Sequence, residues 1–241
     1  MKDLLNWLRT GTATFFEVAV DPESAFRRDL GGHSYMLPLC VLGLVFALMA
    51  WLQAPLAIQW TRLQMQAANA SPDQVSASLA VMMRVQRWAL AAVPALLFAK
   101  WVLSAAMVWL AAQLCLVNLT FARGLGVVAY SYLPVCFRDA TVLFILWMRG
   151  AGTLDHPDAL NPAIGLNLLL PQLSQPWSTL AGNCNVFELW YLMLMVLGIS
   201  AAAAVRRRTA LAVVLPGWLA TLLIQLCLIS LGQSMRSGNS W

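Results

Sequence analysis

Six polar side chains lie inside long apolar runs of this sequence: Gln53, Lys100, Arg138, Asp139, Glu188 and Gln225. A charged side chain at the centre of a bilayer costs about 2.5–3.5 kcal/mol on insertion scales, so such groups usually pair or line a polar path. The two basic and two acidic residues balance in charge, and we predict Lys100 beside Asp139 or Glu188, with Arg138 beside the other acid. These residues therefore indicate either structural ion pairs or a path for protons or a substrate.

Other residues of reactive type do not have the spacing of a known site. His156 within Asp155-His156-Pro157-Asp158 could hold a metal, but one His flanked by carboxylates and a proline is more typical of a solvated turn. No G-x-S-x-G, H-E-x-x-H or Walker loop occurs, so we expect neither an enzyme nor a cofactor. The five cysteines have no CxxC spacing and predict no zinc site or disulfide framework: Cys40, Cys115, Cys136, Cys184 and Cys227.

The composition determines the class of protein that must hold these residues. The chain has 241 residues, of which 61% are hydrophobic and 10% are charged, whereas soluble domains have about 45–50% and about 25%. So little charge excludes a soluble globule, and so much apolar content excludes disorder. The net charge of +5 and the pI of about 9.2 fit contact with anionic lipid headgroups and not with nucleic acid.

We predict an all-α, polytopic integral membrane protein with five transmembrane helices, because a crossing needs about 20 apolar residues. Five runs qualify. The expected spans are about 36–57, 88–117, 124–148, 186–205 and 209–231, within one transmembrane domain at 36–231.

The distribution of Lys and Arg predicts the orientation. With five spans, the N-terminal segment and the second and fourth loops share one side and carry eight Lys and Arg, against five on the other side. Arg206-Arg207-Arg208 makes the largest contribution, although Arg84 and Arg87 oppose it. We therefore expect a cytoplasmic N-terminus and an external C-terminus.

The six polar residues fall at one expected depth. At about 1.5 Å per helical residue, each lies roughly 20–25 Å from the cytoplasmic end of its span. Near the outer boundary, long side chains can reach the headgroups. We favour a structural layer of paired residues that fixes the helix register, and we keep a proton or substrate pathway as the alternative.

The segments outside the spans have recognisable helix signals. Residues 1–35 contain the apolar stripe Leu4 to Leu8 and predict an amphipathic helix in the membrane interface. Because the first long apolar run starts at Met36 and is of spanning length, we expect no cleaved signal peptide. Asp21-Pro22 and Ser71-Pro72 are helix-start signals, and residues 232–241 are expected to form a short external tail.

Two loops and two prolines complete the expected layout. We expect a polar loop from Gln59 to Arg87 that contains an amphipathic helix, with Val75, Leu79 and Met82 at helical spacing. A second long loop covers residues 150–185, where the short apolar run 164–170 could dip into the interface. We expect Pro94 and Pro134 to kink their spans or, for Pro94, to mark the start of one, and the small residues at and after Gly198 to permit close helix packing.

Several short segments resemble the Ypt-interacting protein (YIP) domain family of five-span membrane proteins. They are Asp21 to Phe26 followed by Pro38, Ala129 to Pro134, Asn185 to Trp190, and the stretch from Gly198 to Arg208. The Asn-x-Phe-x-x-Trp segment is similar to bacterial members, although Glu188 stands where a small polar residue is expected. The eukaryotic Asp-Leu-Tyr-Gly-Pro segment is absent, so binding of Rab-type GTPases does not carry over.

The resemblance implies five spans, a cytoplasmic N-terminus and a role in organising or binding membrane components. We therefore expect a non-catalytic subunit or scaffold of a membrane assembly in a bacterial inner membrane, with the lipid bilayer and other membrane proteins as partners. The alternative is a small transporter or ion-coupled channel that uses the polar layer.

Overall fold

The structure, a computed structural model, has helices as its regular secondary structure and no strands in the part of the chain that it describes. It describes residues 12–27, 35–67, 69–150, 162–174 and 177–237. The chain divides into two compact units. Unit 1 comprises Met1–Pro38, Lys100–Val135 and Ala163–Trp241, and unit 2 comprises Leu39–Ala99 and Cys136–Pro162.

Unit 1 is a helical bundle built around α8. Its elements are a helix over residues 12–20, α2 (Pro22–Arg27), the end of α4 (Pro72–Leu114), α5 (Phe121–Ser131), η3 (Leu166–Leu168), α7 (Trp177–Asn183), α8 (Val186–Ala202) and α9 (Arg207–Ser237). Helix α8 packs on α2, α5 and α9. The core contains Phe26, Val127, Ile199 and Val213, each at most 1% exposed.

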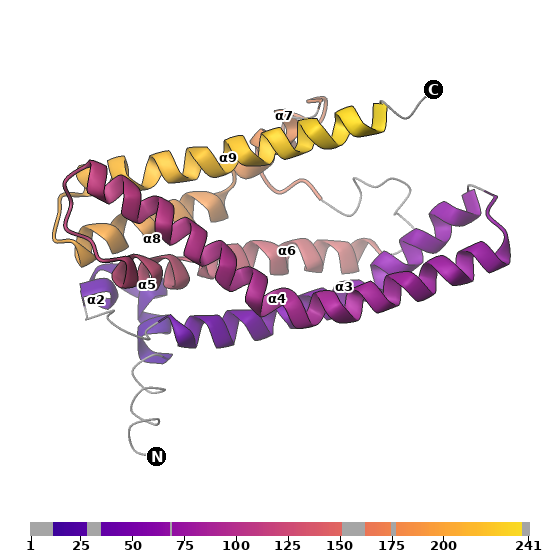
Figure 1. Cartoon of the computed structure of the whole chain (residues 1–241), viewed down its shortest axis with the longest axis horizontal. Helices are drawn as coiled ribbons and strands as arrows, with labels where there is room; N and C mark the ends of the chain where they lie inside the picture. The colour runs from indigo at the N-terminus through magenta and orange to yellow at the C-terminus, as the bar shows by residue number, and fades with distance from the viewer. Residues whose placement is uncertain (1–11, 28–34, 68, 151–161, 175–176, 238–241) are drawn as a thin grey trace, which may run out of the picture. The chain divides into compact units, whose positions relative to one another are not determined.

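Unit 2 contains most of α3 (Met36–Ala67), the first part of α4 up to Ala99, and α6 (Leu133–Arg149) from Cys136 onward. Helices α3 and α4 form an antiparallel hairpin with a short turn between Ala67 and Pro72 (Figure 1). They approach closely at Gly43, where an added Cβ would lie 3.5 Å from Cβ of Pro94. Leu56 of α3 and Leu146 of α6 form a small buried cluster.

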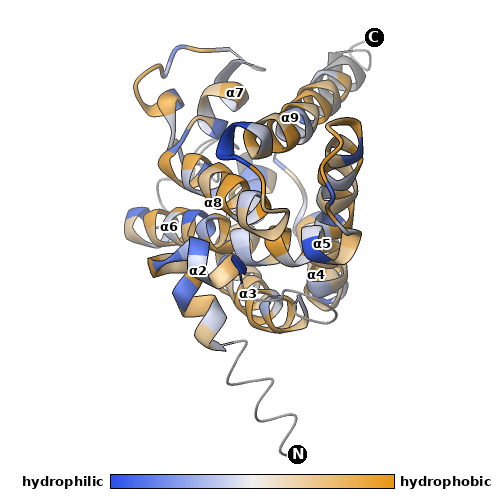
Figure 2. Cartoon of the chain, turned by 90° about the vertical axis from the view of Figure 1, so that its left-hand side faces the viewer, coloured by the Kyte–Doolittle hydropathy of each residue, from blue (hydrophilic) through white to orange (hydrophobic). Residues whose placement is uncertain are grey.

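The outward surfaces of these helices are apolar, which identifies the solvent as lipid. Within the described residues, four helices are long and apolar enough to cross a membrane, and the number is five if α7 and α8, bent by 59° at a short break, form one span. Only 18–44% of the most apolar window of each of the four is buried inside the protein. In Figure 2 most of the visible length of α8 and much of α9 has hydrophobic colour. The chain is therefore an all-α, multi-pass membrane protein.

Helix boundaries differ from the expected spans at several places. Helix α3 continues to Ala67 and α4 begins at Pro72, so the predicted loop Gln59–Arg87 is almost entirely helical. Pro94 lies within α4 and does not mark its start. Helix α9 continues to Ser237 and takes up much of the expected tail at 232–241.

The third span also differs from the expected one, because it starts earlier and is broken before Pro134. This span begins at Phe121 and is interrupted at Tyr132, between α5 and α6. Pro134 has no N–H to donate to a carbonyl one turn earlier, which explains an interruption just before it. The expected interfacial helix at residues 4–8 lies outside the described residues.

Candidate functional site

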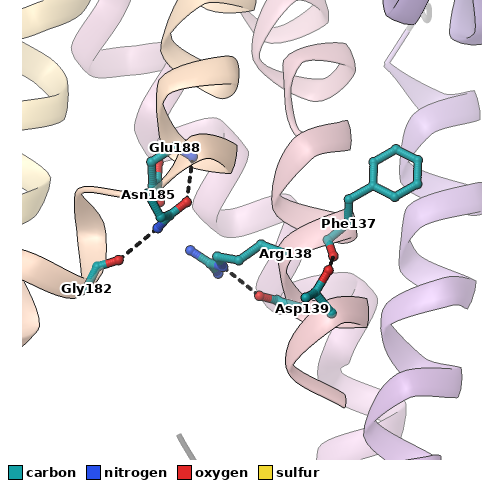
Figure 3. A network of polar contacts seen from close by, with 7 residues as sticks. Phe137, Arg138, Asp139, Gly182, Asn185 and Glu188 are labelled. Carbon is teal, nitrogen blue, oxygen red and sulfur yellow. Dashed lines mark hydrogen bonds and ion pairs between the residues drawn. The ribbon is translucent and has the colours of Figure 1, made fainter. Parts of the chain in front are cut away.

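Asn185 organises the start of α8 in unit 1. Its side chain is 5% exposed, and its Oδ1 accepts a hydrogen bond from the N–H of Glu188 at 2.9 Å. Its Nδ2 donates to the carbonyl of Gly182 at 2.8 Å, which ties the end of α7 to the start of α8 (Figure 3). This N-cap places half-buried Glu188 in the first turn of α8, where its carboxylate interacts favourably with the positive end of the helix dipole.

Lys100 lies at an aromatic cluster of unit 1 that consists of Trp101, Tyr132 and Tyr191. The Lys100 ammonium is 5.2 Å from the centroid of the Tyr132 ring, within the range of a cation–π contact. The Tyr132 ring also meets Trp101 at 5.8 Å and Tyr191 at 6.2 Å, both edge to face. The cluster thus joins α4, α8 and the break between α5 and α6.

Two buried polar atoms of unit 1 lack a hydrogen-bond partner among the described residues. They are the Oγ of Ser131, next to the helix break, and the indole Nε1 of Trp101. Both residues are 0% exposed. A buried donor without a partner is costly, so these atoms are places where a water molecule or a polar ligand would gain free energy.

Gln225 makes a second polar link in unit 1. Its Oε1 accepts a hydrogen bond from Nδ2 of Asn183 at 3.2 Å, and the same Nδ2 donates to the carbonyl of Thr179 at 3.0 Å. The link ties α7 to α9. Asn183 was not among the predicted residues, and the asparagines at 183 and 185, close before a span, were the available signal.

Arg138 and Asp139 form an ion pair on α6 in unit 2. The Arg138 Nε lies 2.8 Å from Oδ1 of Asp139, and the two side chains are 25% and 34% exposed (Figure 3). Consecutive residues of a helix do not normally face each other, so the long Arg138 side chain folds over to reach its neighbour. We predicted Lys100 or Arg138 as the partner of Asp139, and the pair described here is the one with Arg138.

Three other predicted residues, Gln53, Pro134 and Gly198, lie within the described helices. Gln53 is half-buried on α3, and Pro134 is buried at the start of α6. Gly198 lies where α8 meets α5 and α2, since an added Cβ would come within 2.5 Å of Val127 and 3.3 Å of Phe26. The Asp155–Asp158 segment with His156 lies outside the described residues, and within those described no three His, Cys, Asp or Glu gather as a metal site.

Comparison of the chain with models of known protein families, with curated proteins and with solved structures finds no match.

Proposed function

We propose that the protein is a non-catalytic, multi-pass subunit or scaffold that binds another membrane protein, with α3 and α4 as its docking element. The proposal places it in a bacterial inner membrane with a cytoplasmic N-terminus, as the charge distribution and the YIP resemblance suggest. One observation carries it: the α3–α4 hairpin is longer than a membrane is thick and displays an apolar stripe on its outer part.

The lengths of the two helices support an extension beyond the bilayer. Helix α3 has 32 residues and α4 has 43, which correspond to about 48 and 65 Å at 1.5 Å per residue. The hydrocarbon core is about 30 Å thick. We name residues 59–67 and 72–87 the outer hairpin; they include Arg62, Arg84 and Arg87, all exposed.

The outer hairpin has an inner face and a separate apolar face. Val75, Leu79 and Met82 are half-buried, and Thr61 of α3 donates a hydrogen bond to the sulfur of Met82 at 3.3 Å. Val81 and Val85 are instead 61% and 60% exposed. Together with Trp88, at the edge of the outer hairpin and 74% exposed, they have the i, i+4, i+7 spacing of one helix face.

This apolar stripe of Val81, Val85 and Trp88 is suited to a helix of another protein. An apolar strip of this period is the pattern through which helices pack against one another. Helical spacing places Arg84 and Arg87 on one side of the stripe, so acidic residues on the matching side of the partner would complement it.

Purification in mild detergent tests the proposal. The wild-type protein should retain a stoichiometric membrane-protein partner, and Val81→Glu combined with Val85→Glu should lower its recovery at least tenfold, as quantified by mass spectrometry. Ser76→Glu combined with Met83→Glu is the matched control, because both residues lie on α4 well away from the stripe and are exposed. Equal recovery from the two double variants, or a wild-type protein without a partner, would refute the proposal.

A transporter or ion-coupled channel is the second candidate, and the unpartnered Ser131 Oγ and Trp101 Nε1 favour it. Trp101 belongs to the aromatic cluster at Lys100, and Ser131 directly precedes its member Tyr132, so a polar solute there would have donors to bind. Measurements of solute uptake and ion flux in proteoliposomes distinguish a transporter or channel from a scaffold. This candidate requires a signal that Lys100→Met abolishes without changing the amount of folded protein, and the absence of any signal removes it.

A further inference from the structure

A groove with basic walls lies at the turn between α8 and α9. Its volume is about 630 Å³, within the range of small-molecule sites. Arg27 of α2 and Arg206 and Arg207 at the start of α9 line it, together with Glu23 of α2. Its apolar wall includes Leu197 and Ala201 of α8. All of these residues belong to unit 1, so the groove is a feature of one compact body.

The charges of this groove do not cancel. Glu23 forms an ion pair with Arg207, which leaves the guanidinium groups of Arg27 and Arg206. Both are exposed, and within the described part of the chain neither forms an ion pair. Guanidinium groups bind phosphate oxygens in a bidentate manner, so the groove is suited to a phosphate ester.

The position of the groove fixes the level at which it meets its ligand. Helices α8 and α9 are apolar, and only residues 203–206 connect them. A turn between two lipid-facing helices must lie at the boundary between membrane and water, because its free backbone groups need hydrogen bonds. In Figure 2 the hydrophilic start of α9 is blue beside the orange of α8. The groove is therefore at the level of the lipid headgroups.

We propose that this groove binds an anionic phospholipid, with Arg27 and Arg206 on the headgroup phosphate and with Leu197 and Ala201 against the glycerol and the first acyl carbons. The apolar wall distinguishes a lipid from free phosphate, since a soluble anion would gain nothing from Leu197. Basic pockets between transmembrane helices are a known arrangement for such headgroups. The site is independent of the outer hairpin and of the partner proposed for it.

Native mass spectrometry of the full chain in detergent tests this site, with phosphatidylglycerol as the probe and phosphatidylcholine as the neutral comparison. One Arg near a membrane surface contributes about fivefold in lipid affinity, so Arg27→Gln combined with Arg206→Gln should weaken retention of phosphatidylglycerol roughly 30-fold. Binding of phosphatidylcholine should be weak and unchanged.

Arg84→Gln combined with Arg87→Gln is the matched control, because it removes the same charge from the outer hairpin. If both double variants lose phosphatidylglycerol equally, the attraction is a bulk effect of charge and the groove is not the site. Displacement of the lipid by inorganic phosphate or glycerol 3-phosphate at millimolar concentration would show a soluble anion as the ligand and overturn the proposal. Equal binding of phosphatidylcholine and phosphatidylglycerol would overturn it as well.

Discussion

Gly198 is the residue at which the packing of unit 1 is tightest. An added Cβ would lie 2.5 Å from Cγ1 of Val127 on α5 and 3.3 Å from the ring of Phe26 on α2. Val127 is 0% and Phe26 is 1% exposed, so neither side chain has free space to move into. Small residues at helix crossings let backbones approach, which matters in lipid because no hydrophobic force draws the helices together.

Gly198→Ala should destabilise the protein by about 1–3 kcal/mol, because the new methyl group forces a shift in a filled core. Thermal unfolding in detergent, followed by the helical circular dichroism signal, measures the effect. Gly217→Ala is the control: its Cβ would lie 3.6 Å from Cβ of Met107, an ordinary contact. It should be neutral or stabilising by up to about 1 kcal/mol, the helix propensity gained over glycine. Equal effects of the two changes would contradict this account of Gly198.

At the scale of elements, three helices in the described part of the chain end at a non-glycine residue in the left-handed conformation. These residues are Asn69 after α3, Leu116 after α4 and Ala204 after α8, with φ of 55°, 56° and 54°. After α4, the N–H of Val117 donates to the carbonyl of Ala112 at 2.8 Å, which is the long hydrogen bond of a Schellman motif. The conformation costs a residue such as Leu116 or Ala204 about 1–2 kcal/mol, whereas Asn adopts it more readily, so the turns after α4 and α8 hold a small strain.

Leu116→Gly should therefore stabilise the protein by up to about 1 kcal/mol, since relief of the strain exceeds the added entropy of the unfolded chain. Leu116 is 95% exposed, so little packing is lost. Leu114→Gly is the control, because this leucine is 86% exposed and has a helical backbone. It should destabilise by up to about 1 kcal/mol. A lower unfolding temperature for both variants would rule out strain at Leu116.

Helix starts could be predicted from the sequence, because their signals are local. Ser71 and Gln74 form a reciprocal cap, with hydrogen bonds of 3.0 and 3.3 Å, at the predicted start before Pro72. The Asp21 carboxylate accepts from the N–H of Ser24 at 3.3 Å at the other predicted start. The ends at Leu116 and Ala204 could not be predicted, since a residue forced into the left-handed region by its tertiary setting leaves no signature in its type.

The outer hairpin and the aromatic cluster were missed for different reasons. Hydropathy indicates where a helix leaves the lipid, but it does not indicate where the helix ends. The Gln and Arg residues of 59–87 are good helix formers, so α3 and α4 continue through this polar stretch. Lys100 could be predicted as a site residue because a charge within an apolar run is visible in the sequence. Its contact with the Tyr132 ring could not be predicted, because that contact depends on where α4 packs against the break after α5. Such contacts are set by packing between distant segments, which spacing along one chain does not encode.

At the scale of the molecule, the number of crossings depends on α8. Its 17 residues cover about 26 Å, slightly less than the hydrocarbon core of about 30 Å. Helix α7 precedes it at an angle of 59° and is itself short. If α8 crosses, Cys184 before it and Arg208 after it lie on opposite sides of the membrane. If α8 does not cross, they lie on the same side.

Labelling with a membrane-impermeant maleimide distinguishes these topologies. On a cysteine-free background, Cys184 is restored in one variant and Arg208→Cys is introduced in another; Cys184 is exposed in the structure. With five crossings and a cytoplasmic N-terminus, Cys184 should react in intact spheroplasts, and the Arg208→Cys variant should react only after permeabilisation. Restored Cys115, an exposed residue in the turn between α4 and α5, should behave like the Arg208→Cys variant.

Each outcome of this labelling has its own structural meaning, because the other four candidate spans have at least 25 residues each and are long enough to cross by themselves. Reaction of both Cys184 and the Arg208→Cys variant from outside would reduce the crossings to four and move the α8–α9 turn, with its basic groove, to the external leaflet. Reaction of Cys115 and the Arg208→Cys variant from outside, with Cys184 protected, would keep five crossings and reverse the orientation predicted from Lys and Arg. All three sites should react in detergent, which verifies that each thiol is chemically accessible.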